Sequence, residues 1–293
     1  MTALSELSAI IGRVVGAVGP SIVGIGRHHR GSGVVIADGR ILTNAHNVRG
    51  QDVTVRFSGG RTAVGRPTGM DGDGDLAVIE VDTTGAAPIV WGDGGALAVG
   101  SVVFGMSSSP NGASRVTFGT VSAVERAFRG PGGRRISGSI EHTAPLAPGS
   151  SGGPIVDDGG RLLGLNTNRL GEGFYLALPA DAALQARVEA LTRGESPRRR
   201  RLGVAVAPGG VARRLRRSVG LSDRDGVLVR GVEDGSSAAS AGVAEGDLIV
   251  SVSGRAVTDP DDLVDALDEA TPPFELGVVR GATELTLQVP ADV

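Results

Sequence analysis

The sequence predicts a mainly β protein that contains two domains. The chain has 293 residues, which is enough for two separate hydrophobic cores. Its 48 glycines and 15 prolines together make up more than a fifth of the chain, as is typical of folds built from short strands and turns. Between residues 21 and 128, short β-branched runs alternate with turns such as Asp71-Gly72-Asp73-Gly74. The same features disfavour an all-helical fold.

Three segments depart from the strand pattern and are expected to be helices. Residues 4–18 carry an apolar stripe at spacings of three and four, which we expect to pack on the first group of strands. Residues 181–193 form an amphipathic pattern with Asp181 as the N-cap. Residues 259–267 combine a helix start with an acidic first turn. Between the second and third helices, residues 195–201 contain a proline and four arginines and are predicted to be a linker.

The segment with the clearest chemical meaning is 149–154, which reads Gly-Ser-Ser-Gly-Gly-Pro. A serine hydroxyl becomes a nucleophile when a base removes its proton and donors stabilise the developing oxyanion. Gly149 allows a backbone conformation in which its N–H and that of Ser151 point at one position. The next two glycines permit close approach by a substrate. Serine and glycine also cluster in ordinary loops, so this segment needs partners elsewhere in the chain.

Two upstream segments supply those partners. His46 ends the apolar run 41–46, and Asp75 precedes the strand-like run 76–81. Taken singly, such a histidine is more often structural and such an aspartate more often a turn residue. The order His46, Asp75, Ser151 is nevertheless that of base, orienting carboxylate and nucleophile in a chymotrypsin-type triad. The three segments together therefore predict a serine hydrolase, whose chemistry requires neither a metal nor a cofactor.

These segments resemble the catalytic signatures of the HtrA/Deg serine proteases. The matching stretches are Thr-Asn-Ala-His at 43–46, Asp-Leu-Ala-Val at 75–78 and Pro-Gly-Ser-Ser-Gly-Gly-Pro at 148–154. The resemblance implies a chymotrypsin-like double β-barrel with an N-terminal helix over 1–194, a linker at 195–201 and a PDZ domain over 202–293. It also implies an endopeptidase for unfolded or damaged proteins, with an oxyanion hole at Gly149, Ser150 and Ser151. Family members form trimers, so a homo-oligomer is possible here.

The C-terminal part resembles a bacterial PDZ domain. Residues 202–206 (Leu-Gly-Val-Ala-Val) match the family's carboxylate-binding loop and its following strand, and 237–243 with 246–249 match an internal signature. The resemblance implies that a peptide C-terminus adds as a strand beside 204–206. Its carboxylate would be bound near Leu202, Gly203 and Val204. Leu202, Val204, Leu263 and Leu267 would line the side-chain pocket, although one or two of them could instead fill the core.

One departure from the family pattern and two further features refine the expectation. Ser150 replaces the usual asparagine and cannot form the ion pair that activates digestive enzymes after N-terminal cleavage. The segment 143–148 before the nucleophile carries no charge, which predicts cleavage after small or medium aliphatic residues rather than after Arg or Lys. Residues 125–138 mix glycines with arginines, which predicts a mobile loop that by resemblance controls activity.

Composition limits the remaining classes of function. A net charge of −3 and a pI near 5.9 give no reason to expect nucleic acid as a partner, and the arginines at 198–201 and 213–217 are expected to face solvent. No cysteine is present, which excludes disulfides. No signal peptide or membrane-spanning run is recognised, so the chain as given is predicted to be cytoplasmic. If a leader has been removed, the alternative is a periplasmic or other extracytoplasmic protein.

Two other functions remain open at this stage. A protease-derived chaperone or scaffold would bind peptides without cleaving them, but it has no physical need for all three triad groups. A nucleic-acid adaptor acting through the arginine clusters is the more distant possibility.

Overall fold

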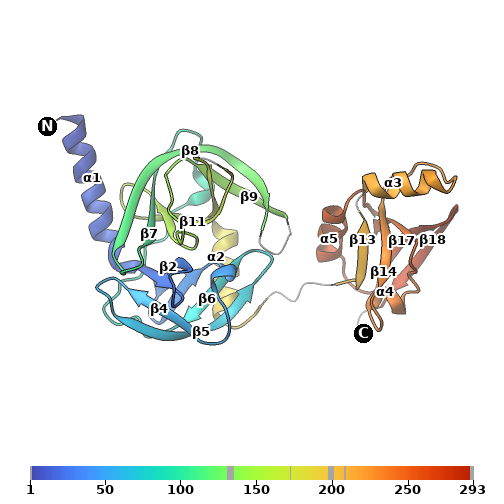
Figure 1. The fold of residues 1–293 in the computed structure, drawn as a ribbon, viewed down its shortest axis with the longest axis horizontal. Coiled ribbons are helices and arrows are strands. Elements are labelled where there is room, and N and C mark those ends of the chain that lie inside the picture. Colours follow the sequence, from blue (N-terminus) through green and yellow to red (C-terminus); the bar gives the residue numbers. More distant parts are fainter. Residues whose placement is uncertain (1, 131–134, 172, 197–200, 208, 291–293) are drawn as a thin grey trace. The chain divides into compact units, whose positions relative to one another are not determined.

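The protein folds into two compact units, Met1–Pro197 and Arg198–Val293. The structure, a computed structural model, describes residues 2–130, 135–171, 173–196, 201–207 and 209–290 (Figure 1). The prediction of a mainly β fold is confirmed, because two closed barrels and a six-stranded sheet dominate the described residues. Most of the predicted linker falls on residues 197–200, which lie outside the described residues. The proposed domain limits therefore remain a prediction.

The first barrel closes in the strand order β1-β2-β3-β6-β5-β4. Its inward side chains alternate with outward ones, as in β4, where every second residue is buried. The antiparallel pairing of β3 with β6 places Leu42 opposite Val78 and Thr43 opposite Ala77, and this pairing later positions the site. The strands are β1 (Ile22–Ile25), β2 (Gly31–Ala37), β3 (Arg40–Thr43), β4 (Val53–Phe57), β5 (Thr62–Asp71) and β6 (Leu76–Glu80).

The second barrel closes in the order β10-β11-β12-β9-β8-β7. Buried side chains of both barrels, among them Leu42 and Val78 from the first and Phe104 and Leu165 from the second, join one hydrophobic cluster. The two barrels therefore share a core that holds the residues between them in place. The strands are β7 (Val102–Ser108), β8 (Ser114–Arg129), β9 (Arg135–His142), β10 (Pro154–Val156), β11 (Leu162–Arg169) and β12 (Tyr175–Pro179).

The predicted mobile loop at 125–138 is wrong in its extent. Residues up to Arg129 continue β8, and β9 begins at Arg135, with Phe128 paired to Ile136. Both of these apolar side chains are buried in the shared core, which explains why a glycine- and arginine-rich segment forms a hairpin. Of the predicted loop, residues 131–134 lie outside the described residues.

Two helices flank the barrels. Helix α1 (Ala3–Val18) confirms the predicted stripe; it contacts β8 of the second barrel, and its buried residues join the core that both barrels share. Only Val14 and Val18, near its C-terminal end, are buried in the shared core, so the N-terminal half projects from the barrels (Figure 1). Helix α2 (Ala182–Thr192) begins as predicted, because the Asp181 carboxylate accepts a hydrogen bond from the Leu184 N–H. Short 3₁₀ turns are η1 (Gly19–Ser21), η2 (Ala45–Asn47) and η3 (Gly94–Ala96).

The expectation that no segment could span a membrane is wrong for the N-terminus. Residues Ala3–Ser21 are long and apolar enough to do so by length and composition, because Glu6 and Arg13 are the segment's two charges. Only 17% of the most apolar window is buried in the structure. A signal sequence has the same length and apolar composition, so the predicted cytoplasmic location is no longer supported.

The second unit is a sheet in the order β13-β14-β15-β17-β18, with β16 paired to β15. Helix α5 (Pro260–Glu269) confirms the predicted start, since Asp259 and Asp262 form a capping box. Of the arginines predicted to face solvent, those at 198–200 lie outside the described residues. Those at 213–217 lie on helix α3 (Gly209–Ser218), where Arg216 is buried and donates to the carbonyl of Ser222. The other elements are β13 (Val204–Ala207), β14 (Val227–Val232), α4 (Ser237–Ser240), β15 (Leu248–Val252), β16 (Arg255–Ala256), β17 (Phe274–Arg280) and β18 (Thr283–Val289).

Candidate active site

The pairing of β3 with β6 brings His46 to Asp75. His46 lies in the turn η2 just after β3, and Asp75 lies just before β6, so the antiparallel register sets their separation. The His46 Nδ1 is 2.9 Å from each oxygen of the Asp75 carboxylate, and the His46 backbone N–H also donates to Oδ1 at 3.2 Å. Because a carboxylate only accepts hydrogen bonds, Nδ1 carries the proton and Nε2 is left as an acceptor.

The Asp75 side chain is buried and receives donors from both barrels. The Thr167 hydroxyl, on β11 of the second barrel, donates to Oδ2 at 2.6 Å. The Asn44 amide donates to the Asp75 backbone carbonyl at 3.0 Å. Asp75 has a φ of 54°, an uncommon conformation for a residue other than glycine, and these bonds fix it. A buried charge is tolerated only when it is paired and hydrogen-bonded, and here both oxygens are.

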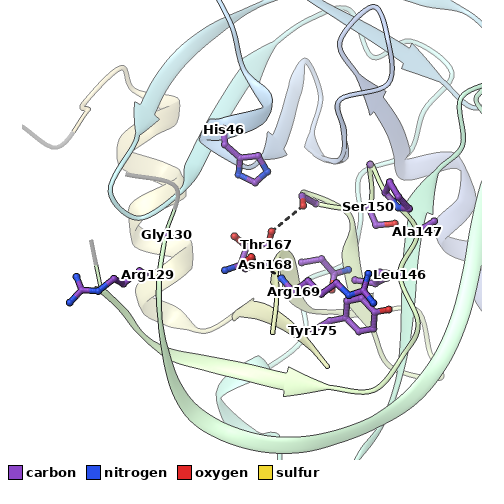
Figure 2. Close-up of a pocket in the computed structure, with 14 residues that line it drawn as sticks. His46, Arg129, Gly130, Leu146, Ala147, Ser150, Thr167, Asn168, Arg169 and Tyr175 are labelled. Atoms are coloured by element: carbon purple, nitrogen blue, oxygen red, sulfur yellow. Dashed lines mark hydrogen bonds between the residues drawn. The ribbon is translucent and has the colours of Figure 1, made fainter. Parts of the chain in front are cut away.

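Ser151 lies in the loop between β9 and β10, opposite His46. Its Oγ donates a hydrogen bond to the Thr167 carbonyl at 3.0 Å, shown dashed in Figure 2. Between the described Ser151 and His46 side chains there is no hydrogen bond. The structure thus joins the predicted histidine and aspartate directly and places the predicted serine on the same cleft, with its hydroxyl turned toward β11.

The loop before Ser151 is anchored to the first barrel. Ser32 on β2 donates through its hydroxyl to the Gly149 carbonyl at 2.8 Å and through its N–H to the Ser151 carbonyl at 2.8 Å. Gly149 has a φ of 85°, which only glycine adopts readily. The Ser150 N–H donates to the Ala147 carbonyl and is therefore occupied, so Ser150 can contribute to an oxyanion hole only by positioning its neighbours. Within the described residues, the Gly149 and Ser151 N–H groups donate no hydrogen bond.

A cavity of about 500 Å³ opens beside these groups (Figure 2). His46 borders it from the first barrel, and the second barrel supplies the other lining residues. Figure 2 shows Leu146, Arg169 and Tyr175 together on the side away from His46. The lining consists of His46, Arg129, Gly130, Leu146, Ala147, Pro148, Gly149, Ser150, Ser151, Asn166, Thr167, Asn168, Arg169 and Tyr175.

A buried histidine, which no sequence motif indicates, supports this cavity. His142 is fully buried, stacks on Tyr175 with 5.8 Å between ring centroids, and lies with Nε2 2.9 Å from the Asn166 Oδ1. The Asn166 amide in turn donates to the carbonyls of Gly153 and Pro154, just after the nucleophile. Burial lowers the pKa of His142 to about 4, although the hydrogen bond to Asn166 opposes this shift. Only the fold brings these three residues together.

In the second unit, the residues expected to bind a peptide lie around the free edge of β13. Gly203 has a φ of 78°, and a Cβ there would lie 2.2 Å from the Ser236 Cβ, so glycine is required on both counts. Leu202, Leu263 and Leu267 are buried in the core of this unit, and Val204 is half-buried against it. The burial of these three leucines supports the alternative that some of the residues predicted to line the peptide pocket instead fill the core. β13 pairs only with β14, which leaves its other edge available for a strand.

Comparison with known proteins agrees with this arrangement. A family model described as a trypsin-like peptidase domain matches residues 31–165, and one described as a PDZ domain matches residues 228–280. A probable periplasmic serine endoprotease DegP-like from Halomonas elongata is 31% identical over 272 residues, covering 90% of this chain and 56% of that protein. The mitochondrial serine protease HTRA2 of Drosophila pseudoobscura pseudoobscura is 30% identical over 277 residues, covering 88% and 65%.

Solved structures extend the similarity to nearly the whole chain. The HtrA-type protease AlgW with decapeptide shares the fold with a TM-score of 0.77 at 23% identity, covering 96% of this chain and 98% of that one. The serine endoprotease from Yersinia pestis has a TM-score of 0.72 at 26% identity, covering 96% and 97%.

Fold and site together define a trypsin-like peptidase domain followed by a PDZ domain. The chain belongs to the HtrA family of serine proteases, as the resemblance of its motifs predicted. It spans 56% to 65% of the length of the first curated relatives that it matches.

We predict that Gly152→Ala displaces the nucleophile loop. Gly152 has a φ of 84°, and an added Cβ would lie 2.1 Å from the Ser32 carbonyl oxygen and 2.5 Å from the Thr43 Oγ1. The free energy of unfolding should fall by about 2 kcal/mol or more in urea denaturation. Gly85→Ala is the matched control, because Gly85 has a φ of 83° with nothing within 4 Å of the added Cβ. Equal losses in the two variants would show that the contact with Ser32 has no effect.

We also predict that His142 makes stability depend on pH. Its pKa in the folded state, about 4, lies below the ordinary histidine value of 6.5, so the unfolded chain binds the proton more readily. Stability is therefore full above pH 6.5 and is lost as the pH falls toward 4. Between pH 8 and pH 5 this group should lower the free energy of unfolding by about 2 kcal/mol. Urea denaturation of His142→Gln should show a pH dependence smaller by that amount, and an unchanged dependence would exclude this role.

Proposed function

We propose that the protein is a serine endopeptidase in which Ser151 is the nucleophile, His46 the general base and Asp75 the orienting carboxylate. The observation that carries this proposal is the 2.9 Å pair between His46 Nδ1 and a buried carboxylate, formed beside a cavity that also contains Ser151. With Nδ1 protonated, Nε2 can remove the proton of Ser151 Oγ as this oxygen attacks the substrate carbonyl carbon. The same proton then passes from His46 to the departing amine, and water hydrolyses the acyl-enzyme by the reverse sequence.

The Gly149 and Ser151 N–H groups would hold the oxyanion that forms during attack. They are the two backbone donors of the 149–153 loop that form no other hydrogen bond in the described residues. The other three N–H groups are occupied: Ser150 donates to the Ala147 carbonyl, Gly152 to that of Asn166, and Gly153 to that of Ser150. Donors fixed before the reaction need no reorganisation when charge develops. Removing one such donor typically costs about 10² to 10³ in kcat.

The hydroxyl of Ser151 must turn before it can react. It now donates to the Thr167 carbonyl, and a rotation about χ1 would carry it from that acceptor toward His46 Nε2. The rotation sacrifices one hydrogen bond with a net value of about 1 kcal/mol and gains another of similar kind. The orientation seen here is therefore a resting orientation whose free energy differs little from that of the reactive one.

The remaining features of the proposal concern organisation and setting. We assign residues 1–194 to the protease domain, 195–201 to a linker and 202–293 to a PDZ domain that binds peptide C-termini along β13. The substrates would be unfolded or damaged proteins, and a homotrimer would match the family. An extracytoplasmic location is supported by the apolar segment Ala3–Ser21 and by relatives named as periplasmic or mitochondrial.

A non-cleaving peptide-binding scaffold is the second candidate. It is favoured by one observation, that Ser151 Oγ bonds the Thr167 carbonyl instead of His46. The buried Asp75 counts against it, because a scaffold gains nothing from a desolvated carboxylate held under a histidine.

The triad can be tested by substitution. Ser151→Ala and His46→Ala should each reduce cleavage of unfolded casein by about 10³-fold or more, because the members act as a unit. Asp75→Asn should also reduce it strongly, since an amide cannot fix the same tautomer of His46. Ser8→Ala, on the exposed face of α1, is the control and should retain full activity. Casein cleavage by Ser151→Ala at the wild-type rate would exclude the protease mechanism.

The PDZ assignment can be tested by binding. A peptide that ends in valine with a free carboxylate should bind roughly tenfold more tightly than its C-terminal amide, because the backbone donors near Gly203 would lose a charged acceptor. Calorimetric titration of both peptides measures the difference. Gly203→Ala should weaken binding of the acid form, as its side chain would collide with Ser236. Equal affinities of the acid and the amide would show that the carboxylate is not recognised.

A further inference from the structure

A second cavity, of about 610 Å³, lies on the first barrel between the β1–β2 loop and the segment that follows His46. Three exposed arginines border it, Arg27, Arg30 and Arg49, which we call the first-barrel arginines. Within the described part of the chain, none of them forms an ion pair. The one carboxylate of the lining, Asp52, is 3.3 Å from the Arg66 Nε outside the cavity. The lining consists of Gly26, Arg27, His28, Arg30, Asn47, Arg49, Asp52, Val53 and Thr54.

This cavity adjoins the nucleophile. Asn47 lines it, and the preceding His46 lines the cavity of the second barrel, so two consecutive residues border the two cavities. The Asn47 amide donates to the Ser151 carbonyl at 2.9 Å. From the β1–β2 loop, His29 lies so close to Gly149 that a Cβ on that glycine would be 2.6 Å from its Nε2. The first-barrel arginines therefore flank the site on one side of Ser151.

The cavity on the other side is also cationic. Arg129 and Arg169 line it, and its described lining contains no carboxylate. The Arg169 guanidinium lies over the Tyr175 ring, 5.8 Å from the centroid, and its Nε donates to the Gly171 carbonyl, so this cation is held in position (Figure 2). Arg56 and Arg115 are close enough to His29 to help burial lower its pKa. A chain with a net charge of −3 thus presents arginines on both sides of its nucleophile.

We propose that the cleft selects polypeptide segments that carry aspartate or glutamate on both sides of the scissile bond. This inference rests on the proposed endopeptidase function and names its substrate class. Exposed arginines around a cleft attract carboxylates during diffusion and pair with them on arrival. A single-stranded nucleic acid fits less well, because no Phe, Tyr or Trp lines the first-barrel cavity and Tyr175 is only 7% exposed, so bases would find little surface for stacking. The aliphatic preference at the cleaved residue itself is a separate prediction.

The test compares two quenched fluorogenic peptides of equal length with amidated C-termini, so that a terminal carboxylate plays no part. Both contain the same aliphatic residue at the scissile bond; one has two glutamates on each side and the other has glutamines. At low salt, kcat/KM should favour the acidic peptide by roughly three- to tenfold. The preference should shrink at 0.5 M NaCl, because the screening length falls well below its value of about 10 Å at 0.1 M.

Substitution of the first-barrel arginines tests whether they cause the preference for the acidic peptide. The triple variant Arg27→Gln, Arg30→Gln, Arg49→Gln should lower the ratio of kcat/KM for acidic and neutral peptides clearly below its wild-type value, and the preference that remains is due to Arg129 and Arg169 in the other cavity. The matched control is Arg13→Gln, Arg214→Gln, Arg230→Gln, which changes the net charge equally at three exposed arginines outside both cavities. It should keep the wild-type ratio. Equal loss of preference in both variants would attribute the effect to overall charge and overturn the proposal.

A binding measurement separates this inference from the protease mechanism. Fluorescence anisotropy of labelled acidic and neutral peptides on the Ser151→Ala variant needs no turnover, and the acidic peptide should bind more tightly. Preferential binding without any cleavage by the wild type would reject the proposed enzyme but keep the selectivity. Cleavage of both peptides at equal kcat/KM would reject the selectivity but keep the enzyme. Tighter binding of an oligothymidine through the same three arginines would overturn the acidic-peptide assignment in favour of nucleic acid.

Discussion

The buried Asp75 carboxylate is the interaction on which the rest of the site depends. It receives the His46 ring and backbone N–H from the first barrel and the Thr167 hydroxyl from the second. A desolvated charge is stable only with such partners, so the burial that makes Asp75 costly also fixes the tautomer of His46 and the spacing of the two barrels. The same strand that supplies Thr167 supplies the carbonyl that holds the Ser151 hydroxyl at rest. One strand, β11, therefore contacts both Asp75 and Ser151.

The nucleophile loop is rigid because backbone groups from both barrels bind it. Ser32 bonds the carbonyls of Gly149 and Ser151, and the Asn166 carbonyl accepts the Gly152 N–H at 2.7 Å. Gly152 approaches Ser32 too closely for any side chain to fit. Beneath it, Asn166 links the loop to the neutral, buried His142. The N–H groups that we propose as oxyanion donors are thus positioned by contacts that form without a substrate, and in the proposed mechanism reactivity depends on rotation of the Ser151 hydroxyl.

The net charge of this protein does not show how its charged residues are distributed. The chain is slightly acidic overall, yet arginines line both cavities that flank Ser151. These arginines come from segments far apart in the sequence: the β1–β2 loop, the turn after His46, and the ends of β8 and β11. Because field strength near a cleft depends on the local arrangement of charges, net charge alone says little about which substrates the cleft attracts.

The sequence by itself determined the fold class, the three helices predicted over 4–18, 181–193 and 259–267, and the choice of His46, Asp75 and Ser151 as the candidate triad. Capping residues and the order of the three catalytic motifs can be recognised in the sequence itself, without knowing how the chain packs. The tertiary structure alone decided that β8 and β9 form a hairpin where a loop was expected, that α1 meets β8, and that three pocket leucines of the second unit are core. It also decided that His142 stacks under the site and that separated arginines converge around it. These features are contacts between residues distant in the chain, so they follow from strand pairing and shared burial, which no local pattern encodes.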